Sequence, residues 1–348
     1  MTDFIDDIMG FDPQDLNVFN EPTKVNYDQN VYKTNPANSK SEDGRYRSKI
    51  KILYNPFSVK DSIVKQCTYA MTDGDGFFIV KSKLANNDKT CPIFNSWKKL
   101  WFSGDESKKN WAKQMYEKSE SQWVLVQILE DENQPELVGQ FKAMKLPKVI
   151  YEKMEAKMKP SPESKKTPVP ITDYLIGLVL EMDVQPGPDD PANPSRKQRE
   201  ISYSLCDFGE YSPIIKTDGT QLFTDEELET IDNFATAKEN IGKAKTEAKK
   251  QAAEKAYVEL VPSIKQLYAK AIEYMKENAI DIVEECAYKE WDEKTATRVN
   301  NWITAVSQMQ DPKTYTPSST QAPATTVEGT PTSTEDVVDD MMGDDLPF

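Results

Sequence analysis

The chain has 348 residues, a formal net charge of −15 and no histidine. The lack of histidine excludes Ser-His-Asp and Cys-His catalysis and any zinc site that needs an imidazole ligand. The charge is uneven, because residues 44–160 hold 21 basic and 14 acidic side chains whereas residues 317–348 hold 7 acidic and no basic ones. A basic centre between acidic ends indicates an anion-binding body whose acidic segments could compete for its site.

The four cysteines are far apart and form no Cys-x-x-Cys pair, so we expect reduced and mostly buried thiols. The N-terminal segment is acidic and lacks the basic and apolar regions of a signal peptide. No run approaches the ~18 apolar residues of a membrane span. We therefore expect a cytoplasmic protein, and we expect no metal or cofactor because no clustered acid pairs end the predicted core strands.

Residues 1–43 are polar and rich in Asp, Asn and Pro, which predicts a flexible acidic arm. Alternating or continuous apolar patterns bounded by turn residues then predict about seven short strands, at 46–54, 63–71, 77–80, 123–129, 137–144, 175–182 and 200–207. Helical spacing predicts inserted helices within 92–120 and 147–158. This order, dominated by hairpins, predicts an α+β fold with an OB-type antiparallel β-barrel core over residues 44–216.

The C-terminal third has helical patterns instead. Thr224-Asp225-Glu226-Glu227 is a helix start signal, and apolar residues keep helical spacing as far as Val306. We predict two to four helices in a helical region over 217–310, where the Ala/Lys/Glu-rich stretch 235–258 is either a solvated helix or a coiled-coil arm. Residues 311–348 predict a disordered linker and an acidic tail.

Basic and aromatic residues are interleaved in the predicted β core. In Arg45-Tyr46-Arg47-Ser48-Lys49-Ile50-Lys51 the cations alternate, so a strand would place them roughly 7 Å apart on one face. Cations can bind phosphates and aromatic rings can stack on the bases of a single strand. The alternative is that the tryptophans are core residues and the lysines a solvated face. The candidate DNA-binding residues are Arg45, Tyr46, Arg47, Lys49, Lys51, Tyr54, Tyr69, Phe78, Lys81, Lys83, Trp97, Lys98, Lys99, Trp101, Lys108, Lys109 and Trp111.

The C-terminal end combines carboxylates with an apolar tip. Such a tip can dock in an apolar pocket of a partner while its carboxylates contact that partner's Lys and Arg. It can also lie in the chain's own basic groove until DNA displaces it. The alternative is a solubilising tail, although that role does not require the ending Leu-Pro-Phe. The candidate partner-binding residues are Asp339, Asp340, Asp344, Asp345, Leu346, Pro347 and Phe348.

Over roughly residues 44–210 the chain resembles the single-stranded DNA-binding proteins of T-even phages. The resemblance is carried by Ile50-Lys51-Ile52-Leu53-Tyr54, Gly76-Phe77-Phe78-Ile79, Thr90-Cys91-Pro92-Ile93-Phe94 and the hairpin 123–144. The tip from Asp344 to Phe348 is similar to the end of bacterial single-stranded DNA-binding proteins. The resemblance implies a non-enzymatic protein of phage DNA replication, recombination and repair in the host cytoplasm. It also implies that the tail recruits replication and recombination proteins and that the protein can self-associate on DNA.

The chain departs from that family at its zinc site and its arm. The positions of the family's one histidine and three cysteines fall on Tyr69, Ser82, Cys91 and Phe94, of which only Cys91 can bind zinc. We therefore expect no zinc, with Tyr69 and Phe94 packed in that volume. The family's basic N-terminal arm is not matched, and the helices of 225–309 have no counterpart, so they could pack on the core, mediate oligomerisation or bind a partner.

Two other classes of function stay open from the sequence. One is a Mg²⁺-dependent nucleic-acid enzyme, which would cleave a labelled single strand. The other is a structural or scaffold protein built on the 225–309 helices, which would not bind oligo(dT) even at low salt.

Overall fold

The computed structural model describes residues 30–36, 39–86, 90–161, 168–189, 191, 200–244 and 246–316. Within these residues the fold is α+β, and an eight-stranded sheet, antiparallel apart from one parallel pair, is not closed. The OB-type barrel that we expected is therefore not confirmed. The strands are β1 Val31–Tyr32, β2 Tyr46–Leu53, β3 Ile63–Asp73, β4 Gly76–Ser82, β5 Glu117–Asp131, β6 Phe141–Leu146, β7 Leu178–Val184 and β8 Asp207–Tyr211.

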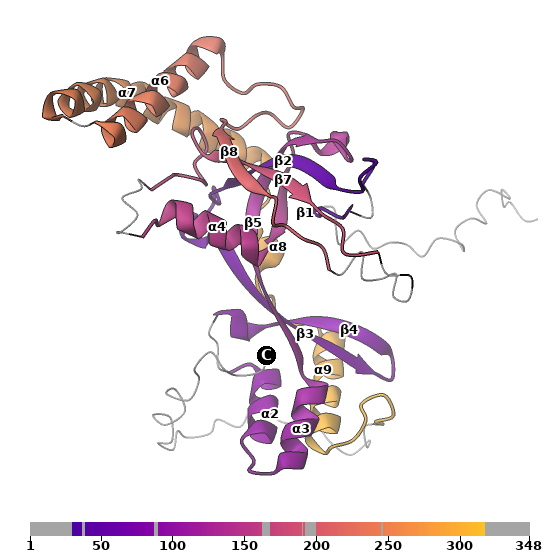
Figure 1. Ribbon diagram of the computed structural model, residues 1–348. Coiled ribbons are helices and arrows are strands. Elements are labelled where there is room, and N and C mark those ends of the chain that lie inside the picture. Colours follow the sequence, from indigo (N-terminus) through magenta and orange to yellow (C-terminus); the bar gives the residue numbers. More distant parts are fainter. Residues whose placement is uncertain are drawn as a thin grey trace, which may run out of the picture.

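Helices are inserted between the strands and follow them. The α-helices are α2 Pro92–Trp101, α3 Glu106–Met115, α4 Lys148–Met158, α6 Asp225–Lys243, α7 Glu247–Asn278, α8 Ile282–Cys286 and α9 Glu293–Ser307. Short 3-10 turns are η3 Val59–Asp61, η4 Lys83–Asn86 and η5 Pro135–Leu137. In Figure 1, α6 and α7 form a helical hairpin that projects from one end of the molecule.

The 15-residue strand β5 connects two lobes of the molecule. Its second half pairs with β2 and its first half pairs with β3 along the same edge, while β6 pairs with its other edge. We call β1, β2, β6, β7, β8, α4 and the second half of β5 the sheet lobe. We call β3, β4, α2, α3, α9 and the first half of β5 the hairpin lobe. Figure 1 shows β5 crossing from one lobe to the other.

Three buried apolar clusters form the cores of the two lobes. On one face of the sheet lobe, Ile52 of β2 and Val126 of β5 share a cluster with Ile150 of α4. On the other face, Leu53 and Leu125 share a cluster with helices α6, α7 and α8. The third cluster joins β3, β4, α2 and α9 in the hairpin lobe. Because strands alternate their side chains, the two faces of the sheet lobe bury different helices, and the helices of 217–310 pack on the β core.

Most of the predicted elements are present. The turn between β3 and β4 is confirmed, with Gly76 at a positive φ of 106°. The helix start at Thr224 is also confirmed, because the Glu227 N–H donates to Thr224 Oγ1 and the Thr224 N–H donates to the Glu227 carboxylate. In the described part of the chain four helices follow this position, at the upper limit of our prediction.

The structure differs from two predictions of local structure, in the second case only over the described part of the segment. The expected strand at 200–207 is a loop with a single bridge between Gln185 and Ser202. Its Ile201 and Tyr203 side chains pack against the buried cluster on the α4 face of the sheet lobe. Residues 1–29 of the expected flexible arm over 1–43 lie outside the described residues, but the described part includes β1, which lies parallel to β6 and is held by the Tyr32 hydroxyl donating to Asp131 at 2.7 Å. Two residues are too few for a strand pattern to be visible in the sequence.

Candidate nucleic-acid interface

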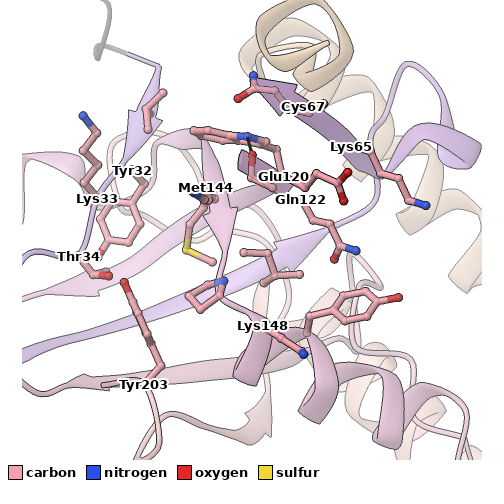
Figure 2. A pocket seen from close by; sticks show the side chains of 18 of the residues that line it. Tyr32, Lys33, Thr34, Lys65, Cys67, Glu120, Gln122, Met144, Lys148 and Tyr203 are labelled. Atoms are coloured by element: carbon pink, nitrogen blue, oxygen red, sulfur yellow. Dashed lines mark hydrogen bonds between the residues drawn. The ribbon is translucent and has the colours of Figure 1, made fainter. Parts of the chain in front are cut away.

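A groove of about 870 Å³ lies where the two lobes meet. Its walls come from β1 and the residues after it, from β3, from the first half of β5, and from the junction of β6 with α4 (Figure 2). The lining residues are Val31, Tyr32, Lys33, Thr34, Lys65, Gln66, Cys67, Leu84, Glu120, Ser121, Gln122, Trp123, Met144, Lys145, Leu146, Pro147, Lys148, Tyr151, Ile201 and Tyr203.

Strand pairing builds the floor of the groove. Lys65 of β3 lies opposite Gln122 of β5, which in turn lies opposite Leu146 of β6. Directly opposed residues point to the same face of a sheet, so these side chains share one surface. Farther along that face, Val124 and Met144 belong to the buried cluster that contains Ile150 of α4. The groove is therefore the open end of a face whose other end is core.

The groove is basic. Lysines 33, 65, 145 and 148 line it together with one acidic residue, Glu120, whose carboxylate accepts from Lys118 at 2.8 Å. Lys65 and Lys145 are exposed and make no ion pair within the described residues. Lys148 lies 3.9 Å from Glu152 while 89% of its side chain stays exposed. Such cations are available to an anionic ligand.

Four aromatic residues line the groove with these lysines: Tyr32, which is buried, and Trp123, Tyr151 and Tyr203, which are partly exposed. Trp123 is fixed by its indole N–H, which donates to Ser121 Oγ at 3.0 Å. Burial raises the pKa of the Tyr203 hydroxyl above its ordinary value of 10. Figure 2 shows Tyr203 and Thr34 on one side of the groove and Lys65 on the other. Strand alternation places Lys65 and Gln122 on one face of the sheet and Trp123 and Lys145 on the other, so both faces contribute ring and ammonium groups to the lining of the groove.

The first three cations of the predicted row, Arg45, Arg47 and Lys49, form ion pairs with carboxylates. Arg45 Nη1 lies 3.2 Å from Asp183, Arg47 pairs with Asp43, and Lys49 Nζ lies 2.9 Å from Glu130. The sequence could not show this, because Asp183 and Glu130 come from β7 and β5. The expected row of free phosphate-binding cations is therefore not present.

Lys51, the last member of that row, lies in the core. It is fully buried, and its ammonium group donates to the carbonyl oxygens of Gly177, at 3.1 Å, and of Ser212. Burial lowers the pKa of Lys51 to about 7. The prediction that Lys51 contacts DNA is therefore wrong. Strand alternation alone could not show that the backbone around Gly177 and Ser212 covers the Lys51 side chain.

Three predicted aromatic contacts are also core residues. Tyr46 is fully buried, with its hydroxyl donating to Asp131 at 2.8 Å. Tyr69 and Trp97 are 2% and 1% exposed and belong to the hairpin-lobe cluster. For these residues the alternative of structural packing holds, because a ring without accessible area cannot stack on a base.

Four further candidates connect strands to other elements. Tyr54 packs edge-on against Tyr174 with ring centroids 6.2 Å apart, and the Phe78 ring lies 3.9 Å from the guanidinium of Arg298. The Lys81 ammonium donates to the Glu285 carbonyl at 3.0 Å, and Lys83 lies 3.0 Å from Glu290. None of these four side chains lines the described groove.

The remaining candidates, Lys98, Lys99, Trp101, Lys108, Lys109 and Trp111, lie on α2 and α3 and also do not line the groove. The groove lysines and tyrosines were missed because each is isolated in the sequence. One signal could have revealed part of the groove. Ile63, Lys65 and Cys67 share one face of β3, and Lys65 and Cys67 line the groove, so a lysine interrupts an otherwise apolar strand face.

The four positions aligned with the family's zinc ligands come together in the hairpin lobe. The Ser82 hydroxyl lies 3.0 Å from the Cys91 sulfur, and Tyr69 and Phe94 belong to the same buried cluster as Cys91. In the described part of the chain no group of three or more His, Cys, Asp or Glu side chains could hold a metal ion. The acidic tail, with the candidate partner-binding residues from Asp339 to Phe348, lies outside the described residues.

No protein-family model matches the chain, and no curated protein matches it in sequence. None of the helices that the structure describes combines the length and the apolar character needed to cross a membrane.

Proposed function

We propose that the chain binds single-stranded DNA in the groove between its lobes, as a non-enzymatic protein of phage DNA replication, recombination and repair in the host cytoplasm. The observation that carries the proposal is that four lysines and four aromatic residues, three of them partly exposed, line one groove. Ammonium groups bind phosphates without regard to sequence, and stacking on aromatic rings stabilises each base by about 1–3 kcal/mol.

The position of the aromatic residues favours a single strand over a duplex. Trp123, Tyr151 and Tyr203 line a groove rather than a convex surface, so only a base that leaves its neighbours can reach them. Bases of a duplex are stacked on one another and present only their edges in the grooves. A single strand offers both its phosphates and its ring faces to such a site.

The test is a fluorescence anisotropy titration of oligo(dT) of eight nucleotides with a Lys65→Gln/Lys145→Gln variant. We expect its affinity to fall about tenfold or more at about 50 mM salt, and the slope of log K against log salt to decrease by about 1.4, or 0.7 per lost phosphate contact. Lys265→Gln/Lys276→Gln, which removes two exposed charges from α7, is the matched control and should bind like the wild type.

Failure of the wild type to bind oligo(dT) at low salt, also after removal of residues 317–348, would contradict the proposal. The same samples incubated with Mg²⁺ should keep the labelled strand intact. Shorter fragments would show that the protein is an enzyme instead.

We further propose that the acidic tail competes with DNA for the basic groove and recruits replication and recombination proteins. Residues 317–348 carry 7 acidic and no basic side chains, opposite in sign to the lysines of the groove. Deleting residues 339–348 should therefore strengthen binding of the same oligonucleotide at low salt, with a smaller gain at high salt because salt screens the competition. Unchanged affinity at both salt concentrations would remove the competitive role and leave recruitment alone.

A further inference from the structure

Helices α2 and α3 carry lysines that the groove does not use. The five are Lys98 and Lys99 in the last turn of α2 and Lys108, Lys109 and Lys113 on α3. None of them forms an ion pair within the described residues, whereas Arg45 just before β2 and Arg47 and Lys49 on β2 are all paired with carboxylates. The two acidic residues of α3 and its N-cap are Asp105, which accepts from the Ser107 N–H, and Glu106.

Two of these lysines lie beside an aromatic side chain. The ammonium groups of Lys109 and Lys113 lie 5.3 Å and 5.5 Å from the ring centroid of Trp101. Trp101 itself stacks on the buried Trp97, with centroids 5.3 Å apart, and the neighbouring Phe102 is 49% exposed. The indole therefore holds two cations at i, i+4 positions, where like charges repel each other.

We propose that this α2–α3 surface is a second contact for the nucleic acid, one that binds phosphates of the strand beyond the groove. Repulsion between unpaired cations on one helix face destabilises the free protein, and a polyanion removes that repulsion by neutralising them. Phe102 adds an exposed ring beside the cations, which suits a strand with accessible bases better than an acidic peptide. The inference rests on the proposed function, because it extends the path of the same strand.

A purely structural role makes a different prediction. Lysines in the last turn of a helix interact favourably with its C-terminal carbonyl groups, and Lys98, Lys99 and Lys113 occupy such positions. If that were their whole role, replacing lysines here would lower the melting temperature and leave DNA affinity unchanged.

The experiment compares full-length wild type with Lys109→Gln/Lys113→Gln on oligo(dT) of eight and of thirty nucleotides. The short strand occupies only the groove, whereas the long strand can leave it and reach α2 and α3. We expect unchanged affinity for the short strand. For the long strand we expect a loss of about tenfold at about 50 mM salt and a salt slope smaller by about 1.4. Lys265→Gln/Lys276→Gln should change neither, and thermal unfolding should confirm that each variant is folded.

The outcomes separate the two proposals. Unchanged affinity and slope on the long strand would overturn the second contact and leave the groove intact. An equal loss on both strands would also overturn it, because the lysines would then act on the groove itself. A wild type that binds only the long strand, and loses that binding in the variant, would overturn the groove and support the α2–α3 surface. Binding of neither strand would overturn both.

Discussion

A Lys51→Met variant is expected to lose the rise in unfolding free energy that the wild type shows between about pH 7 and pH 9.5, a difference of about 3 kcal/mol. Lys51 is fully buried, and burial lowers its pKa from 10.5 to about 7. In this pH range the unfolded chain keeps the proton on Lys51 whereas the folded chain releases it. The free energy of unfolding of the wild type therefore rises with pH over this range. The same stabilisation is lost as the pH falls from about 10.5 to about 7.

The measurement is urea unfolding of both proteins at the two pH values. Tyrosine ionisation cancels in the comparison, since both proteins carry the same tyrosines. Lys49→Met is the matched control, because Lys49 is on the same strand with 45% of its side chain exposed. It should keep the pH dependence of the wild type. Parallel curves for Lys51→Met and the wild type would show that Lys51 stays protonated in the folded protein.

The buried lysine also explains why this strand face was interpreted as a DNA contact. A lysine on an alternating strand is normally a solvent-facing residue, because burying an ammonium group is costly unless it is hydrogen-bonded. Here two backbone carbonyls, of Gly177 and Ser212, meet over the end of β2 and provide those bonds. Both come from segments more than a hundred residues away, so no local pattern in the sequence predicts them.

The strands and helices were predictable where their patterns are local. The alternation in β2, the Asp-Gly turn before β4 and the capping box at Thr224 each depend on residues within one segment. The groove depends on several segments at once, since only strand pairing and loop packing bring Lys65 of β3, Lys145 of β6 and Tyr203 into the lining of one groove. Apart from the lysine that interrupts the apolar face of β3, no local pattern in the sequence predicts these lysines and tyrosines as site residues, and none predicts that they line one groove.

The two tryptophans of α2 also show that a local sequence pattern does not predict which side chain is buried. Trp97 and Trp101 are one turn apart and have equivalent helical spacing, yet Trp97 is 1% exposed whereas Trp101 is only partly buried. The buried cluster that contains Trp97 also contains Trp302 of α9, from the other end of the chain. Which ring is core and which ring faces the lysines is therefore decided by tertiary packing.

Replacing Arg298 with Met is expected to lower the free energy of unfolding by about 3 kcal/mol. The Arg298 guanidinium donates to both carboxylate oxygens of Asp73, at 2.8 Å and 2.6 Å, and to the Gly76 carbonyl at 3.1 Å. It also lies 3.9 Å from the centre of the Phe78 ring. These contacts fasten α9 to the turn between β3 and β4, and the side chain of Asp73, 14% exposed, would be left without its partner.

The pH dependence of Arg298→Met gives the sharper test. The hydrogen bonds from Arg298 hold the pKa of Asp73 below its usual value of 3.8, so their stabilisation is present above that pH and is lost as the pH falls through it. The variant should therefore differ most from the wild type at neutral pH and less under acid conditions. Lys294→Met, an exposed change on the same helix, should have little effect at either pH.

A double-mutant cycle with Asp73→Asn separates the ion pair from the other contacts of Arg298. If the pair dominates, the two single changes cost similar amounts, and the double variant costs little more than either one. The coupling energy should then be about 2 kcal/mol. Additive costs would mean that the Phe78 ring and the Gly76 carbonyl, rather than the carboxylate, fasten α9 to the hairpin. In that case the link between the C-terminal helices and the strands that wall the groove would be insensitive to acid.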